Sequence, residues 1–190
     1  MNKTLIFTEA NQINIWQKID EIALVLMKFD RDYDPFLMYG EAGIQLFLFH
    51  RCFELDDEEC YAKVADKYFQ KIDNIHKKTL FIDDPQECNA GLAGGLSGIG
   101  WMLDYMIRYP MIDADLFEVM GSADPKVFRR MIYDVQEDRY NLLQGAAGIA
   151  LYCVNGNERF SREYLNRFVA ELHKRMTLGK LNNIQDYSIP

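Results

Sequence analysis

Three turns of the form Gly-x-x-Gly-Ile constrain the fold of this chain more than any other feature. Their first glycines are 55 and then 50 residues apart. This spacing leaves room for one buried helix, one amphipathic helix and two loops in each unit, which is typical of a helical repeat protein. The turns read Gly40-Glu41-Ala42-Gly43-Ile44, Gly95-Leu96-Ser97-Gly98-Ile99 and Gly145-Ala146-Ala147-Gly148-Ile149.

Glycine recurs at two places in each turn, although it lowers helix stability by roughly 0.5–1 kcal/mol relative to alanine. We expect a backbone reason at both places. The first glycine is available for positive φ in the turn that leads into the helix. The second leaves no side chain where neighbouring helices must approach closely. We therefore assign a structural role to all six: Gly40, Gly43, Gly95, Gly98, Gly145 and Gly148.

The segments that follow the turns are apolar nearly all the way round, as helices buried on every side are. They are Ile44–Phe53, Ile99–Ile107 and Ile149–Val154. In the segments between them, apolar residues recur at steps of three and four, which indicates amphipathic helices at the surface. Those segments are Asn11–Met27, Asp57–Lys77 and Ser161–Met176, with Ser161 as the expected N-cap of the last. Outer and inner helices therefore alternate along the chain.

The stretch 111–140 has a weaker pattern. Asp124-Pro125 is typical of a helix start, and we interpret the stretch as two short helices broken near Gly121. No segment alternates apolar and polar residues long enough to suggest a sheet. The predicted fold is all-α, an α/α toroid-like array of helical hairpins, which as a sequence of inner and outer helices forms either an open solenoid or a closed ring. It forms a single repeat domain over residues 1–190, with repeats opening near 40, 95 and 145.

A closed ring of hairpins needs more units than three turns supply. We therefore expect an incomplete ring with one apolar flank uncovered. Further chain, a second copy in a homo-oligomer or an unusual cap would cover such a flank. Residues 182–190 follow an outer helix where another inner-helix turn is expected, which favours further chain.

The charge of the chain argues against a nucleic-acid partner. The formal net charge is −8 and the pI is about 4.9, whereas phosphate binding requires clustered lysines and arginines. No apolar run approaches the roughly 20 residues that span a bilayer, and the first ten residues lack the pattern of a signal peptide. We therefore expect a cytoplasmic protein with no membrane span.

The cysteines have no zinc-ribbon spacing, and we expect all four to be reduced thiols in a cytoplasmic chain. Cys52 and Cys153 fall in apolar helical segments, where a free cysteine behaves as a small hydrophobic residue. The other two are Cys60 and Cys88.

Two of the turns, with the residues that precede them, resemble the repeats of the lanthionine synthetase C family. The segments are Asn89–Trp101, which reads NAGLAGGLSGIGW, and Tyr140–Ile149, which reads YNLLQGAAGI. The resemblance covers roughly residues 39–153 and corresponds to the N-terminal half of the family. It implies an α/α toroid fold in which such turns begin the inner helices.

The resemblance also implies an activity. Cyclases of this family use zinc to activate a peptide cysteine thiolate, which adds to a dehydrated serine or threonine and closes a thioether ring. The family's zinc ligands are two cysteines and a histidine in its C-terminal half, in motifs that include Cys-His-Gly. Nothing in this chain matches them, so we expect no metal site here and no activity of this chain alone.

The family's Tyr-Asp-hydrophobic-hydrophobic-x-Gly motif falls on Tyr140 to Gly145, and its functional acid falls on Asn141. An amide hydrogen-bonds but does not transfer a proton as a carboxylate does, so the resemblance brings no catalytic residue. Tyr140, Asn141 and Gln144 precede an inner helix, where a toroid points them toward a bound peptide. Asparagine is also a common cap of helices and turns, which is the competing interpretation of Asn141.

Other polar clusters are better explained by structure than by chemistry. Residues two apart on a helix point in different directions, so His50 and Cys52 are not expected to form a ligand pair. His76 and His173 lie near predicted helix C-termini, where positive charge is favoured. Asp138 is interpreted as part of a solvated loop rather than a substitute acid. Asp83-Asp84-Pro85 is typical of a turn rather than of the carboxylates of a glycosidase.

The sequence therefore predicts the N-terminal part of a lanthionine synthetase C-like protein, which contributes part of a peptide-binding toroid. The partners that this implies are a peptide substrate and the missing C-terminal half. The alternative is a non-catalytic helical-repeat module that binds a peptide or a protein. A carbohydrate-active toroid enzyme is a third interpretation, which would require a pair of carboxylates in a central cleft.

Overall fold

A computed structural model gives the structure of this protein and describes residues 9–28, 34–38, 40–79, 84–155 and 158–177. These residues form eight helices and no strand, which confirms the predicted all-α class. The helices are α1 (Glu9–Lys28), α2 (Glu41–Leu55), α3 (Glu58–Thr79), α4 (Leu96–Arg108), α5 (Leu116–Met120), α6 (Asp124–Gln136), α7 (Ala146–Asn155) and α8 (Glu158–Thr177).

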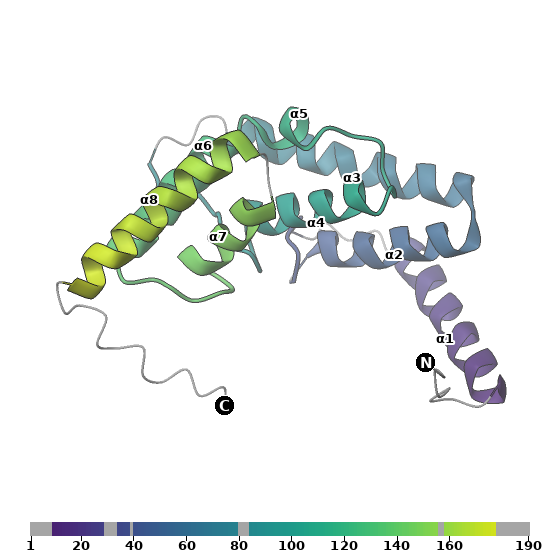
Figure 1. Cartoon of the computed structure of the whole chain (residues 1–190). Coiled ribbons are helices and arrows are strands. Elements are labelled where there is room, and N and C mark those ends of the chain that lie inside the picture. The colour runs from purple at the N-terminus through teal and green to yellow at the C-terminus, as the bar shows by residue number, and fades with distance from the viewer. Residues whose placement is uncertain (1–8, 29–33, 39, 80–83, 156–157, 178–190) are drawn as a thin grey trace.

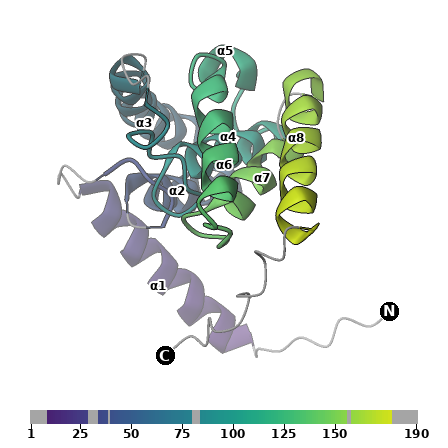
Figure 2. The same ribbon diagram turned by 90° about the vertical axis from the view of Figure 1, so that its left-hand side faces the viewer.

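The helices form hairpins in two layers. Each inner helix (α2, α4 or α7) is followed along the chain by an outer helix (α3, α6 or α8), and the two short helices around Gly121 are α5 and α6. Figure 1 shows α2, α4 and α7 following one another through the middle of the molecule. In Figure 2, α3, α6 and α8 follow one another from left to right, and α6 packs against α8. The predicted alternation of inner and outer helices is confirmed from α2 to α8.

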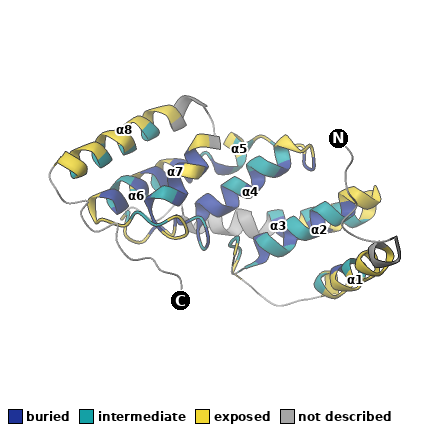
Figure 3. Cartoon of the chain, turned by 60° about the horizontal axis from the view of Figure 1, so that its bottom comes forward, coloured by how far each residue is buried: buried dark blue, intermediate teal, exposed yellow. Residues whose placement is uncertain are grey.

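The core is centred on α4, which lies between α2 and α7. Ile99, Met102 and Leu103 of α4 are fully buried, and Phe49, Phe128 and Tyr152 bury their rings in the same cluster. The prediction that all three inner helices are buried on every side is wrong at the two ends of the array. Figure 3 shows this gradient: α4 is largely dark blue, whereas α7 carries exposed residues.

The first helix does not join the outer layer. It contacts α2 and is directed away from α3, α6 and α8 (Figure 2). Of the apolar residues on its predicted inner face, only Ala23 is buried, while Ile15, Trp16 and Ile22 are exposed. The periodicity predicted the helix correctly but not its packing, because α1 packs mainly against α2 and meets α3 only near its C-terminal end, where Met27 lies beside Cys60.

Two predicted local features are wrong. Helix α8 begins at Glu158, so Ser161 lies inside the helix and is not its N-cap. The periodicity of the same helix predicts Val169 and Met176 on its inner face, but both are exposed. No helix in the described part of the chain is both long enough and apolar enough to cross a membrane.

Candidate functional site

The three inner helices begin from turns with the same backbone geometry. We call residues 34–38 with Gly40, 89–95 and 139–145 together the turn row. In each turn the first N–H of the inner helix donates to the carbonyl seven residues earlier, which fixes the entry of the chain into the helix. The three bonds are Glu41 N–H to Asp34 at 2.7 Å, Leu96 N–H to Asn89 at 2.9 Å and Ala146 N–H to Arg139 at 2.9 Å.

The first glycine of each turn is required because a side chain there would strike the backbone. A Cβ on Gly95 would lie 2.6 Å from the carbonyl oxygen of Asn89, and one on Gly145 would lie 2.5 Å from that of Arg139. The predicted positive φ is wrong: φ is −147° at Gly40 and −155° at Gly95, which is extended backbone open to any residue. Glycine is needed at this position because a Cβ has no space there, and not because the backbone is left-handed.

The second glycine of the turn leaves space for a leucine side chain from the preceding turn. A Cβ on Gly98 would lie 3.0 Å from the Cβ of Leu37, and one on Gly148 would lie 2.8 Å from the Cβ of Leu92. Each would also strike the carbonyl of the leucine in its own turn, which is Leu92 or Leu142. The prediction of close approach is confirmed, and the approaching group is a leucine from the preceding turn.

Backbone hydrogen bonds join the turns into one continuous edge. Met38 N–H donates to the carbonyl of Ala93 at 2.9 Å, and Ala93 N–H donates to the carbonyl of Leu143 at 2.8 Å. These three residues occupy equivalent places in successive turns. The next donor would be Leu143 N–H, which has no hydrogen-bond partner among the described residues. Leu142, the equivalent of Leu37 and Leu92, is 53% exposed.

Helix α6 holds the second and third turns in place. Arg130 donates to the carbonyls of Pro85, Gln86 and Cys88 at 3.0, 2.8 and 2.9 Å, just before the second turn. Asp134 is fully buried and pairs with Arg130 at 2.8 Å and with Arg139, the first residue of the third turn, at 3.1 Å. A buried charge that loses its partner is costly. A shift of either turn would take an arginine away from the buried Asp134 carboxylate, so the network favours one position of the turns.

The three predicted peptide-facing residues lie together at the third turn but differ in exposure. Tyr140 is half-buried, and its hydroxyl donates to Asp138 at 2.7 Å. Burial, and then this bond, raises the pKa of Tyr140 to about 12. The side-chain oxygen of Asn141 accepts the N–H of Gln144 at 2.7 Å, as the turn-capping interpretation expects. Gln144 is exposed, and its side chain reaches Gly91 of the second turn, because a Cβ on Gly91 would lie 2.8 Å from Oε1 of Gln144.

The other polar candidates are separated in the structure. His50 shares a 3.0 Å hydrogen bond with Tyr105 of α4. Asp138 is exposed, has positive φ and pairs with Arg175 of α8 at 3.2 Å. His173 is exposed on α8, and Asp84 accepts the N–H of Gln86. Asp83 and the side chain of His76 lie outside the described residues.

The described residues contain no group of three or more histidine, cysteine, aspartate or glutamate side chains placed to hold a metal ion. The buried thiols of Cys88 and Cys153 are the free ones, and burial raises the pKa of each. A thiolate is the form that binds zinc, so both environments disfavour it. The residues described here therefore do not fit a zinc site.

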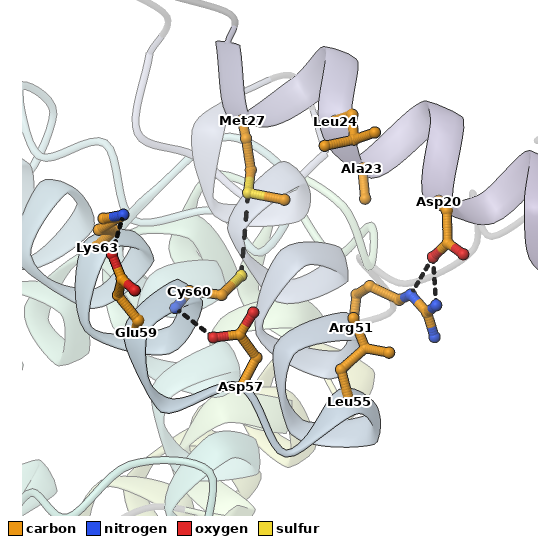
Figure 4. Close-up of a pocket in the computed structure, with 10 residues that line it drawn as sticks. All are labelled: Asp20, Ala23, Leu24, Met27, Arg51, Leu55, Asp57, Glu59, Cys60 and Lys63. Carbon is orange, nitrogen blue, oxygen red and sulfur yellow. Dashed lines mark hydrogen bonds and ion pairs between the residues drawn. The ribbon is translucent and has the colours of Figure 1, made fainter.

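The prediction of four reduced thiols is wrong for one pair, because Cys52 and Cys60 form a disulfide across the turn between α2 and α3. An eight-residue separation within a hairpin brought them together, and the sequence pattern carried no signal for it. The sulfur of Met27 on α1 lies 3.9 Å from the sulfur of Cys60 (Figure 4).

A cavity of about 440 Å³ lies beside this disulfide, between α1 and the α2–α3 turn (Figure 4). Its floor includes Leu24, Met27 and Leu55. Its charged groups are engaged with one another: Arg51 donates to Asp20 at 2.7 Å, and Lys63 pairs with Glu59 at 2.6 Å. The Arg51 guanidinium also lies 5.3 Å from the ring centre of Trp16, so this cluster fastens α1 to α2.

Inner helices that open from glycine turns and alternate along the chain with outer helices define an α/α repeat protein. A family model described as Lanthionine synthetase C-like protein matches residues 31–188. The chain therefore belongs to the lanthionine synthetase C-like family, as its turns suggested. No curated protein and no solved structure matches the chain.

Proposed function

We propose that this chain is the N-terminal part of a lanthionine synthetase C-like toroid and that its turn row faces a bound peptide. The observation that carries the proposal is the repeated contact between a leucine of one turn and a glycine of the next. Leu37 meets Gly98 and Leu92 meets Gly148, whereas Leu142 is exposed at the equivalent place. A further hairpin with glycine at this position would continue the array.

The exposed apolar residues on α7 and α8 support the same proposal. Leu151, Val154 and Val169 are exposed on the helices at the end of the array, and Val154 is 64% exposed. Apolar side chains gathered at one end of a repeat array are typical of an interface with another unit. The same surface would serve a second copy of this chain, which makes a homo-oligomer the competing state.

In this proposal zinc would be held by the C-terminal half of the toroid and not by this chain. The described residues offer no site for it, and Asn141 replaces the acid that the family resemblance expects. The contribution proposed for these residues is to shape and line the peptide site. Gln144 is an exposed polar side chain of the third turn, and Asn141 fixes the backbone beside it.

The experiment compares this chain with the product of its complete reading frame under reducing conditions. Zinc content is measured in both, together with ring closure of a model peptide that carries a dehydroalanine and a cysteine. The proposal expects zinc and ring closure in the longer product alone. Their absence from both products would leave a binding module that has the array without the chemistry.

Peptide contact with the turn row is tested separately. A photoreactive amino acid replaces Gln144 in the longer product, and crosslinking to the same model peptide is measured. The matched control places the photoreactive group at Arg162, an exposed residue of α8. Crosslinking at both positions to the same extent would contradict a peptide site at the turn row.

A further inference from the structure

The outer layer contains a small cavity with arginines and tyrosines in its lining. It lies between α6 and α8, which run side by side in Figure 2, and has a volume of about 200 Å³. No carboxylate side chain belongs to the lining, although the chain carries 29 acidic residues against 21 lysines and arginines. The lining residues are Pro85, Arg129, Ile132, Tyr133, Gln136, Tyr164 and Arg167.

The two arginines of the lining have no anionic partner in the described part of the chain. Arg129 and Arg167 are both exposed, and neither makes an ion pair or a hydrogen bond there. Glu163 lies one turn before Arg167 on α8 and does not pair with it. The neighbouring arginines differ in this respect, because Arg130 and Arg139 share Asp134 and Arg175 is paired with Asp138.

The surroundings add positive charge to this cavity. Arg139 and Arg130 lie 4.9 and 5.9 Å from the ring centre of Tyr133, which is part of the lining. These two guanidinium groups have one buried carboxylate between them, so one positive charge remains uncompensated. Arg129 and Arg130 also lower the pKa of the nearby Cys88 thiol, although burial raises that pKa overall.

Two tyrosines, Tyr133 and Tyr164, form part of the lining. The ring of Tyr164 is held by Phe128 at 4.2 Å and by Arg167 at 5.8 Å. The hydroxyl groups of Tyr133 and Tyr164 have no hydrogen-bond partner among the described residues, so both are available as donors. A cavity of this size is smaller than the roughly 300–1,000 Å³ that encloses a small molecule, and it suits a single side chain.

We propose that this cavity binds an oxyanion side chain of a peptide, a carboxylate or a phosphate, with an apolar residue beside it. The two guanidinium groups supply forked donors that match either oxyanion, and Ile132, Tyr133 and Pro85 supply the apolar surface. This site belongs to the outer layer and is separate from the turn row, so it goes beyond the function proposed above. It gives the protein a second contact with an acidic peptide segment.

The test uses three end-blocked peptides that differ at one residue placed next to a phenylalanine: glutamate, phosphoserine or glutamine. Binding to the full chain is followed by NMR through the backbone amides of α6 and α8. The proposal expects the glutamate or the phosphoserine peptide to shift these amides in a salt-dependent way, and the tighter of the two identifies the oxyanion. Equal shifts with the glutamine peptide, or no shift with any, would overturn it.

The variants separate the site from a general effect of charge. Arg129→Gln and Arg167→Gln are each expected to weaken binding about tenfold, because each removes charged hydrogen bonds to the oxyanion. Arg162→Gln makes the same change on α8 outside the cavity and is expected to leave binding unaltered. An equal loss in Arg162→Gln would mean simple electrostatic attraction. Because the readout is confined to α6 and α8, its failure leaves the turn row proposal standing.

Discussion

The hydroxyl of Tyr152 on α7 donates a 2.7 Å hydrogen bond to the carboxylate of Asp124, the first residue of α6, and both side chains are buried. Burial raises the pKa of Asp124 from 3.8 to about 6, although the bond from Tyr152 acts in the opposite direction. The folded protein therefore binds more protons than the unfolded chain between these pH values. Its stability falls as the pH rises through this window.

We predict that ionisation of this group alone lowers the free energy of unfolding by about 2 kcal/mol between pH 4 and pH 7. Asp124→Asn keeps an acceptor for Tyr152 but has no charge to bury. Urea unfolding at several pH values is therefore expected to give a flatter curve for this variant than for the natural protein. Asp113→Asn removes an exposed carboxylate and serves as the control. Equal slopes in all three proteins would contradict the prediction.

A second prediction concerns Gly148 on α7. Alanine ordinarily favours a helix by roughly 0.5–1 kcal/mol over glycine. At this position its Cβ would lie 2.8 Å from the Cβ of Leu92 and would strike the carbonyl of Leu142. We expect Gly148→Ala to lower the free energy of unfolding by about 1–3 kcal/mol, because backbone has to move.

Ala147→Gly is the matched control for this position, because it makes the reverse change at the preceding residue of the same helix. It measures the intrinsic preference for alanine, which is a loss of roughly 0.5–1 kcal/mol for the glycine variant. Urea unfolding of both variants decides the matter. A Gly148→Ala protein as stable as the natural one would show that the turns are not tightly apposed.

The order of the helices was predictable from the sequence because two signals agreed. The glycine turns at 40, 95 and 145 and the three- and four-residue steps of apolar residues both indicated alternating helices. The break near Gly121 and the helix start at Asp124-Pro125 were also predicted from local residues. In the structure Asp115 caps α5, and Pro125 lies in the first turn of α6. Such signals depend on neighbouring residues in the sequence, so they hold however the helices pack.

The features that failed depend on contacts between distant parts of the chain. The periodicity of α1 indicated an apolar face but not how much of it α2 would cover. The disulfide depends on how α2 and α3 meet, and the role of the first glycine depends on a carbonyl seven residues before the helix. In the sequence, Arg129 and Arg167 look like ordinary surface arginines. That they line one cavity without a carboxylate depends on how α6 packs against α8.

A third prediction concerns the disulfide between Cys52 and Cys60. Thiol titration of the unreduced, denatured protein is expected to find Cys88 and Cys153 alone as free thiols. Reduction is expected to lower the free energy of unfolding by about 2–3 kcal/mol, because the bond restricts a short loop in the unfolded chain. Cys88→Ala is expected to retain this sensitivity to reductant and Cys60→Ala to lose it. Finding all four thiols free before reduction would contradict the assignment.

The last prediction uses the three equivalent leucines of the turn row as one series. Leu37 and Leu92 each place their Cβ against a glycine of the next turn, whereas Leu142 has no such neighbour in the described structure. Leu92 is half-buried, so Leu92→Ser removes the apolar atoms beyond its Cβ and is expected to cost about 1–2 kcal/mol in this chain. Leu142→Ser alters an exposed side chain and is expected to change stability by less than about 0.5 kcal/mol. Urea unfolding measures both values.

The same series distinguishes the possible neighbours of α7. In the product of the complete reading frame, Leu142→Ser is expected to become about as costly as Leu92→Ser, because a further turn would then place its glycine against Leu142. A second copy of the chain would instead make the cost of Leu142→Ser depend on protein concentration, since dimer stability does. Sedimentation velocity separates these cases. A cost that stays small in the longer product and at every concentration would mean that Leu142 is simply exposed.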